Sequence, residues 1–182
     1  MRRKTQPMFI GHLPAGYIIS ALLRPRLQWA GTQGTRFLFA GMLGAVAPDF
    51  DMLYFHLVDH RQHHHHTYFI HFPLFWFGLS LAAGVWLLSG RKQCHAALAF
   101  IFTLNGLAHM VLDSIVGDIW WLAPFVNQRF SLFTVPALYK PWWLNFILHW
   151  SFALELAVVG FAVYLWRRPL QSAGCGLAGA QK

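Results

Sequence analysis

The histidine and aspartate residues of this 182-residue chain recur at spacings that suit a divalent metal ion. His109 and Asp113 are four residues apart, so on a helix their side chains lie on adjacent turns and point to the same side. Asp49 and Asp51 follow Pro48, where a non-helical backbone can present two carboxylates to one centre. Imidazole nitrogens and carboxylate oxygens are common ligands of zinc and related ions. This spacing therefore favours a metal site.

Further candidate ligands lie in two other segments. His12 lies in the first apolar segment, and His66 and His71 lie at the entry to the third. The predicted ligands are His12, Asp49, Asp51, His66, His71, His109 and Asp113. This set exceeds what one tetrahedral zinc ion needs, so we predict one or two ions, with Asp49 or Asp51 as a bridging carboxylate. Zinc is favoured, and manganese and magnesium are the alternatives.

The composition indicates which elements position these residues. Hydrophobic residues make up 57% of the chain and charged residues only 11%, whereas an average soluble domain has roughly 25% charged residues. A soluble globule of this size could not cover its surface with so few charges. We therefore predict an all-α, polytopic membrane protein, with a single domain over residues 1–170 and a flexible C-terminal tail over 171–182.

Five apolar segments are candidate helices. Residues 72–89, 96–116 and 142–166 are each long enough to cross a bilayer, since 18 residues of helix span roughly 27 Å. Residues 8–23 and 37–53 form two weaker segments, which are short, tilted or partly re-entrant. The pattern predicts a bundle of about five helices.

The candidate ligands segregate toward one membrane face if these helices alternate in direction. They then lie at the helix ends that share a face, and the opposite face carries basic residues. Those basic residues are Arg24, Arg26, Arg36, Arg91, Lys92, Arg167 and Arg168. Because ionisable groups at membrane depth are energetically costly and usually functional, we predict a polar site at one face.

The positive charge of the chain favours membrane flanks over nucleic-acid binding. The net charge is +8, from 14 Lys and Arg against 6 Asp and Glu, but the basic residues stand singly or in pairs beside apolar runs. We predict no nucleic-acid partner. Pro14 interrupts the apolar stretch after the basic start, and no small-residue cleavage site is clear, so we treat the N-terminal segment as part of the domain.

Several motifs resemble those of the YdjM-like family of LexA-regulated, membrane-bound, metal-dependent hydrolases. The matching pieces are Gly11-His12, the stretch from Gly44 to Asp51, the stretch from His109 to Asp113, and the stretch from Trp120 to Phe125. The resemblance spans roughly residues 8 to 125. It implies a multi-pass protein of the bacterial inner membrane that requires a metal and hydrolyses a generally unassigned substrate.

The histidine motif of that family fits this chain in two registers. In the family, a His followed by Arg is paired with a second His five residues later. His66 and His71 have this spacing and run straight into the apolar helix, but the arginine is missing. His60 and His65 keep the arginine, Arg61, but leave an extra loop before the helix. We prefer the first register, and the second stays open.

The expected chemistry is hydrolysis, in which a metal-activated water attacks an ester or phosphoester. Asp51 is expected to orient that water or accept its proton, and Arg61 or a loop histidine to neutralise charge on a phosphoryl oxygen. Trp120 and Trp121 belong at a membrane interface, so an amphiphilic substrate is favoured, with a lipid phosphoester as the leading class.

Two other functions fit part of this pattern. A membrane metal transporter or metal-binding protein would also use His and Asp within helices, but a transport path requires ligands at the far face as well. A structural protein would spread polar groups through the membrane depth. His149 and Glu155 lie in the last segment. Glu155 could pair with an arginine, support a ligand or mark a proton path, and the sequence predicts no oligomeric state.

Overall fold

The computed structural model describes residues 10–136, 138–141 and 143–168, and the predicted tail over 171–182 lies outside the described residues. The long helices are α1 (His12–Leu27), α2 (Gly34–Val46), α4 (Pro73–Leu88), α5 (Gln93–Asp113) and α7 (Trp150–Arg167). The shorter ones are α3 (Asp51–Leu57), α6 (Trp143–Ile147) and four 3-10 helices at Gln28–Ala30, Pro48–Phe50, His65–Thr67 and Phe69–His71. The predicted all-α fold class is confirmed.

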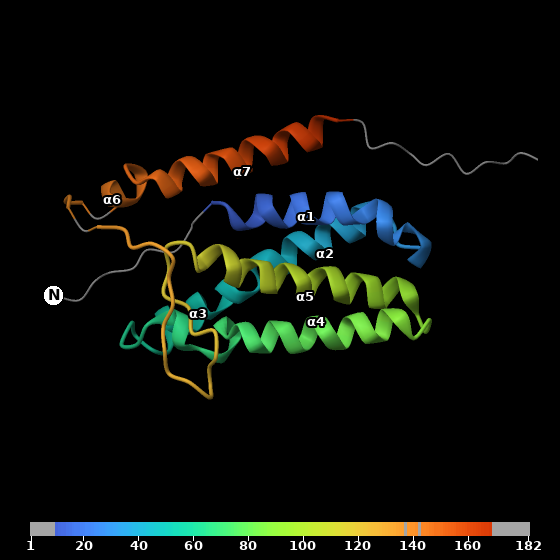
Figure 1. Cartoon of the computed structure of the whole chain (residues 1–182), viewed down its shortest axis with the longest axis horizontal. Coiled ribbons are helices and arrows are strands. Elements are labelled where there is room, and N and C mark those ends of the chain that lie inside the picture. The colour runs from blue at the N-terminus through green and yellow to red at the C-terminus, as the bar shows by residue number, and fades with distance from the viewer. Residues whose placement is uncertain (1–9, 137, 142, 169–182) are drawn as a thin grey trace, which may run out of the picture.

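The long helices run back and forth along one axis of the molecule (Figure 1). α5 packs against both α2 and α4, α1 packs against α2, and α7 lies along α1. The start of α1, the end of α2, the start of α4, the end of α5 and the start of α7 therefore meet at one end, which we call the site end. The opposite, basic end carries Arg24, Arg26, Arg36, Arg91, Lys92 and Arg167.

Small residues let the central helices approach closely. A Cβ atom added at Gly44 of α2 would collide with the backbone carbonyl of Phe102 in α5. One added at Gly106 of α5 would collide with the indole ring of Trp76 in α4. The two glycines thus hold α2 and α4 tightly on opposite sides of α5, and this fixes where the end of α5 meets its neighbours.

Within the described part of the chain, two helices, α5 and α7, are long and apolar enough to cross a membrane. A third span arises if α2 is taken together with residues Pro48–Leu57, which are bent away from it by 51°. Pro48 explains the bend, since it has no N–H to donate and its ring clashes with the preceding helical turn. α4 is apolar but only 16 residues long.

The last predicted span, 142–166, is interrupted in the structure. α6 ends at Ile147 and α7 begins at Trp150, while residue 142 lies outside the described part. His149 has an extended backbone, and its ring nitrogen accepts a hydrogen bond from the Ser151 N–H, so it caps α7 instead of lying within a helix. The unbroken apolar pattern of this segment does not reveal the break between α6 and α7.

The connection after α5 folds back over the site end. The N–H of Leu132 donates to the Ser114 carbonyl, and Ile119 and Phe130 form an isolated antiparallel bridge. An ion pair of 3.2 Å joins Arg129 to Asp118. These contacts hold the backbone around Asp118 against the end of α5.

Candidate metal centre

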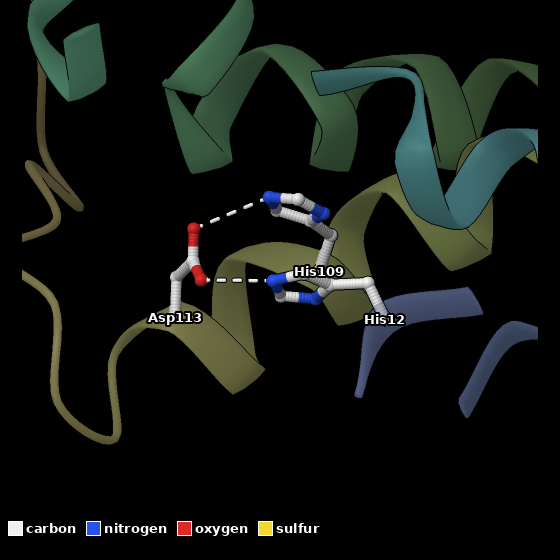
Figure 2. A group of neighbouring side chains, drawn as sticks. All are labelled: His12, His109 and Asp113. Carbon is white, nitrogen blue, oxygen red and sulfur yellow. Dashed lines mark ion pairs between the residues drawn. The ribbon is translucent and has the colours of Figure 1, made fainter. Parts of the chain in front are cut away.

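Asp113, the last residue of α5, has a fully buried carboxylate that faces several imidazole rings. Its Oδ1 lies 3.0 Å from Nε2 of His12, which comes from the start of α1. Its Oδ2 lies 3.2 Å from Nε2 of His109, one turn earlier in α5. Figure 2 shows the two rings converging on the two oxygens of this one carboxylate. The same Oδ2 lies 3.4 Å from Nε2 of His66 and 3.8 Å from Nε2 of His71.

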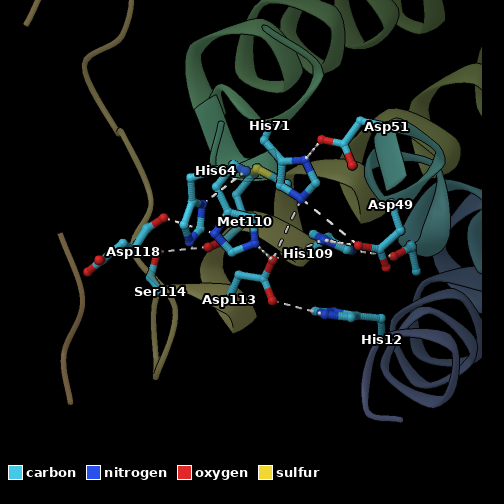
Figure 3. A network of polar contacts seen from close by, with 12 residues as sticks. His12, Asp49, Asp51, His64, His71, His109, Met110, Asp113, Ser114 and Asp118 are labelled. Atoms are coloured by element: carbon cyan, nitrogen blue, oxygen red, sulfur yellow. Dashed lines mark hydrogen bonds and ion pairs between the residues drawn. The ribbon is translucent and has the colours of Figure 1, made fainter. Parts of the chain in front are cut away.

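Among the residues that the structure describes, three overlapping groups of side chains could each hold an ion, because the ligand atoms of each group lie within 4.8 Å of one another. The groups are His12, His109 and Asp113; Asp49, His71 and His109; and His66, His71 and Asp113. We call these six residues the His/Asp cluster; Figure 3 shows its polar contacts. Asp113, rather than Asp49 or Asp51, is the carboxylate that two of the groups share.

Three of the four cluster histidines are oriented through the ring nitrogen that points away from the centre. Nδ1 of His109 lies 2.7 Å from the Ala45 carbonyl oxygen, and Nδ1 of His66 lies 2.9 Å from the Asp118 carbonyl oxygen. Nδ1 of His71 lies 2.5 Å from Oδ2 of Asp51. Metal-binding histidines typically donate their second ring N–H to a carbonyl or carboxylate in this way.

When the imidazoles are neutral, this arrangement directs lone pairs at one another unless a cation lies between them. A carbonyl oxygen only accepts, so Nδ1 of His66 and of His109 must carry the proton, and in a neutral imidazole Nε2 then carries a lone pair. Those Nε2 atoms face carboxylate oxygens of Asp113. Nε2 of His12, Nε2 of His109 and both oxygens of Asp113 are buried without a hydrogen bond among the described residues. The donor set therefore fits a divalent cation.

Burial keeps two of the cluster imidazoles, those of His66 and His71, in the form that binds metal. Loss of solvation lowers the pKa of His66 to about 3 and that of His71 to about 4, so both rings are neutral at physiological pH. The side chain of Asp49 is 40% exposed, whereas that of Asp113 is fully buried. Solvent therefore reaches the cluster on the side of Asp49.

The comparison with protein families identifies the chain as a membrane protein. A family model described as "YdjM inner membrane protein" matches residues 8–174. The chain belongs to this family. Neither a curated protein nor a solved structure matches it. The predicted family and the predicted location in the inner membrane are thus confirmed, and the family match extends further along the chain than the motifs that suggested it.

Six of the seven predicted ligands lie in the cluster, and Asp51 does not. Asp51 belongs to none of the three ligand groups, because its Oδ2 contacts the outward-facing Nδ1 of His71. The structure also distinguishes the two possible registers of the histidine motif. His66 and His71 lie in the cluster, whereas His60 is exposed on the loop. The side chain of His65 is outside the described part of the structure.

The predicted catalytic residue Arg61 lies on the surface. It is exposed, with a left-handed backbone φ of 64°, and its N–H donates to the Phe55 carbonyl. Among the described residues, no hydrogen bond or ion pair joins its side chain to the cluster. His149 is likewise outside the ligand groups.

Sequence reasoning missed two backbone groups that orient the rings, the carbonyls of Ala45 and Asp118. The first had a signal: Ala45 lies in the last turn of α2, where carbonyls lack a helical donor, and Pro48 follows closely. The second had none, since every residue offers a carbonyl and only the fold brings this one to His66.

Proposed function

We propose that the chain is a membrane-bound, metal-dependent hydrolase that cleaves an ester or phosphoester of an amphiphilic substrate, with a lipid phosphoester as the leading class. The observation that carries the proposal is the His/Asp cluster itself. It gathers inward-facing imidazole nitrogens around a buried carboxylate, and solvent reaches one member, Asp49. A catalytic metal site needs such an open side, whereas a purely structural one is closed.

A groove of about 830 Å³ beside Asp51 supports an amphiphilic substrate. Its lining combines aromatic and aliphatic side chains with a few polar ones: Phe50, Tyr54, Phe69, Ile70 and Phe72, together with Asp51, Asp59, His63, Thr67 and Tyr68. Asp51 lies in the wall of this groove and also contacts His71 of the cluster. An apolar chain in the groove would thus place its polar head near the metal ligands.

Asp49 and Asp51 have different roles in the proposed reaction. A bound divalent cation, held by members of the cluster, supplies Lewis-acid activation of water and of the scissile ester. Asp49 is the cluster carboxylate that solvent reaches, so it is better placed than Asp51 to accept a proton from water. Asp51 instead fixes the orientation of the His71 ring. The role of Arg61 in neutralising charge on a phosphoryl oxygen stays a prediction.

Metal transport is the less favoured alternative. A transported ion requires ligands along its path, but all three candidate ligand groups of the described residues lie at the site end. The basic end carries arginine and lysine side chains, which repel a divalent cation.

The proposal is tested by assaying purified protein with phospholipid vesicles and with chromogenic carboxylic and phosphate esters. We expect product release that a chelator abolishes and that added zinc or manganese restores. Asp49→Ala should lower this activity at least about 100-fold, as loss of a general base does. His95→Ala is the control, since His95 is exposed at the basic end and lies outside both the cluster and the groove.

Two results would count against hydrolysis. One is product release that is equal in the wild type and in Asp49→Ala. The other is metal-dependent uptake of cations into sealed vesicles with no ester cleavage, which would favour the transporter.

A further inference from the structure

His12 differs from the other three cluster histidines in how its ring is held. Neither of its ring nitrogens has a hydrogen-bond partner among the described residues. Its ring stacks on that of His109, with centroids 3.8 Å apart and planes 16° apart, and its Nε2 faces Asp113. No clamp on Nδ1 therefore orients this ring, and the position of His12 depends on the backbone at the start of α1.

That backbone is held from another helix. Ile10, two residues before His12, donates its N–H to Oε2 of Glu155 at 2.7 Å. Glu155 lies in α7 and is fully buried. Gly11, at the N-cap of α1, offers no side chain to cap the helix. A carboxylate at this point also interacts favourably with the positive end of the α1 dipole.

Burial of a carboxylate in a membrane-crossing helix costs free energy, so we expect Glu155 to have a structural or functional role. α7 buries few of its described residues, Ser151, Glu155 and Ala162, and it packs along α1. Its contact with Ile10 lies at the site end, next to a metal ligand, rather than along the apolar face of the helix.

We propose that Glu155 is a positioning residue: by holding the chain at Ile10 it fixes His12 within the His/Asp cluster. The inference rests on the metal centre of the proposed function and does not depend on hydrolysis. Glu155 thereby does for His12, through the backbone, what Ala45, Asp118 and Asp51 do for the other rings through Nδ1.

The test uses Co²⁺ binding to the purified full chain, because the visible spectrum of Co²⁺ reports its ligands directly. Glu155→Leu should change the spectrum in the same way as His12→Ala and should weaken Co²⁺ affinity about 10- to 100-fold, as loss of a supporting partner does. Glu155→Gln keeps an oxygen acceptor and should retain the wild-type spectrum. Ser151→Ala, on the same helix, is the matched control and should also retain it.

A double variant separates action through His12 from a general effect. If Glu155 acts through His12, adding Glu155→Leu to His12→Ala changes neither spectrum nor affinity further. Glu155→Asp provides the same test if the leucine variant fails to fold. It retains the negative charge, but its side chain is one methylene shorter, so its oxygens lie further from the Ile10 N–H. Its Co²⁺ spectrum should shift toward that of His12→Ala.

The inference would be overturned, and the metal centre left intact, if Glu155→Leu had the wild-type spectrum and affinity. If the leucine variant does not fold, the same result in Glu155→Asp would overturn it. An additional change in the double variant would overturn it as well. Failure of the wild type to bind Co²⁺ would instead contradict the metal centre, and the positioning role with it.

Discussion

The two ends of the helical bundle bury different kinds of side chain. At the site end, imidazole and carboxylate groups from α1, α5 and the segments between α2 and α4 converge on Asp113. Toward the basic end, α2 and α5 bury Phe37 and Ile101 among alanine side chains. The same helices therefore serve two purposes along their length. Apolar packing holds them together, and their other termini supply the ligands.

This difference predicts that metal binding and packing stability can be changed separately. Substitutions at the site end should alter metal binding more than they destabilise the metal-free fold. Substitutions at the basic end should do the reverse. The predictions below test this separation, from the largest expected effect to the smallest.

Asp113→Asn combined with His109→Ala should abolish metal binding. Each of the three ligand groups contains at least one of these two residues, so the double variant affects all three at once. In the wild type, added zinc should raise the melting temperature, since a ligand that binds only the folded state stabilises it. The double variant should show no such rise. An equal rise in both proteins would exclude Asp113 and His109 as ligands.

Phe37→Ala should show the opposite behaviour. Phe37 is fully buried, and its truncation leaves a cavity that costs about 3–5 kcal/mol of unfolding free energy. Its metal content should equal that of the wild type, because the substitution lies far along α2 from the cluster. Metal loss that accompanies this destabilisation would show that the two ends are coupled.

Asp51→Ala should weaken metal affinity about 10- to 100-fold without abolishing binding, as removal of a partner of a metal-bound histidine does. The reason is the contact of Asp51 with Nδ1 of His71. Asp51→Asn keeps an acceptor and should have a smaller effect. Chelator competition measures both affinities. Complete loss of metal in Asp51→Asn would make Asp51 a direct ligand, as the spacing of the aspartates first suggested.

Acid should destabilise the metal-free protein through the buried histidines. Burial holds the pKa of His66 at about 3 and that of His71 at about 4, whereas an unfolded histidine titrates near 6.5. At these two rings the unfolded chain therefore binds more protons below about pH 6.5, and their contribution to stability is lost as the pH falls from about 6.5 to about 3. Above pH 6.5 both states are neutral at these rings and the effect vanishes.

Melting temperatures of the metal-free protein at about pH 7.5 and pH 5 measure this loss. Lowering the pH should destabilise the wild type more than His66→Gln, because the variant lacks one of the two buried rings that bind a proton on unfolding. His95→Gln, which changes an exposed histidine at the basic end, should behave as the wild type does. An equal change of melting temperature in the wild type and in His66→Gln would contradict the burial argument.

The convergence of the candidate ligands could be predicted from the sequence because it depends only on helix direction and on local spacing. Alternating helix directions bring distant helix ends together, and the i, i+4 spacing of His109 and Asp113 places both on one face. Pro48 marked the bend that turns Asp49 toward the centre. These features need only chain direction and local geometry.

The sequence could not predict features that depend on rotation of a side chain or on tertiary contact. Spacing alone does not say which nitrogen of His71 faces inward. It therefore predicts Asp51 as a ligand, whereas in the structure Asp51 contacts the outward-facing Nδ1 of His71. The cap at His149 lies within an apolar run that predicts one continuous helix. The contact of Glu155 joins residues 145 positions apart, and no local pattern indicates such a pairing.

The metal content of the wild-type protein tests the central claim most directly. The protein would be extracted from membranes and purified without chelators after growth with added zinc and manganese, and its metals measured by elemental mass spectrometry. The account predicts about one or two divalent ions per chain, with none retained in the matched preparation of the Asp113→Asn, His109→Ala double variant. Negligible metal in both preparations would contradict it.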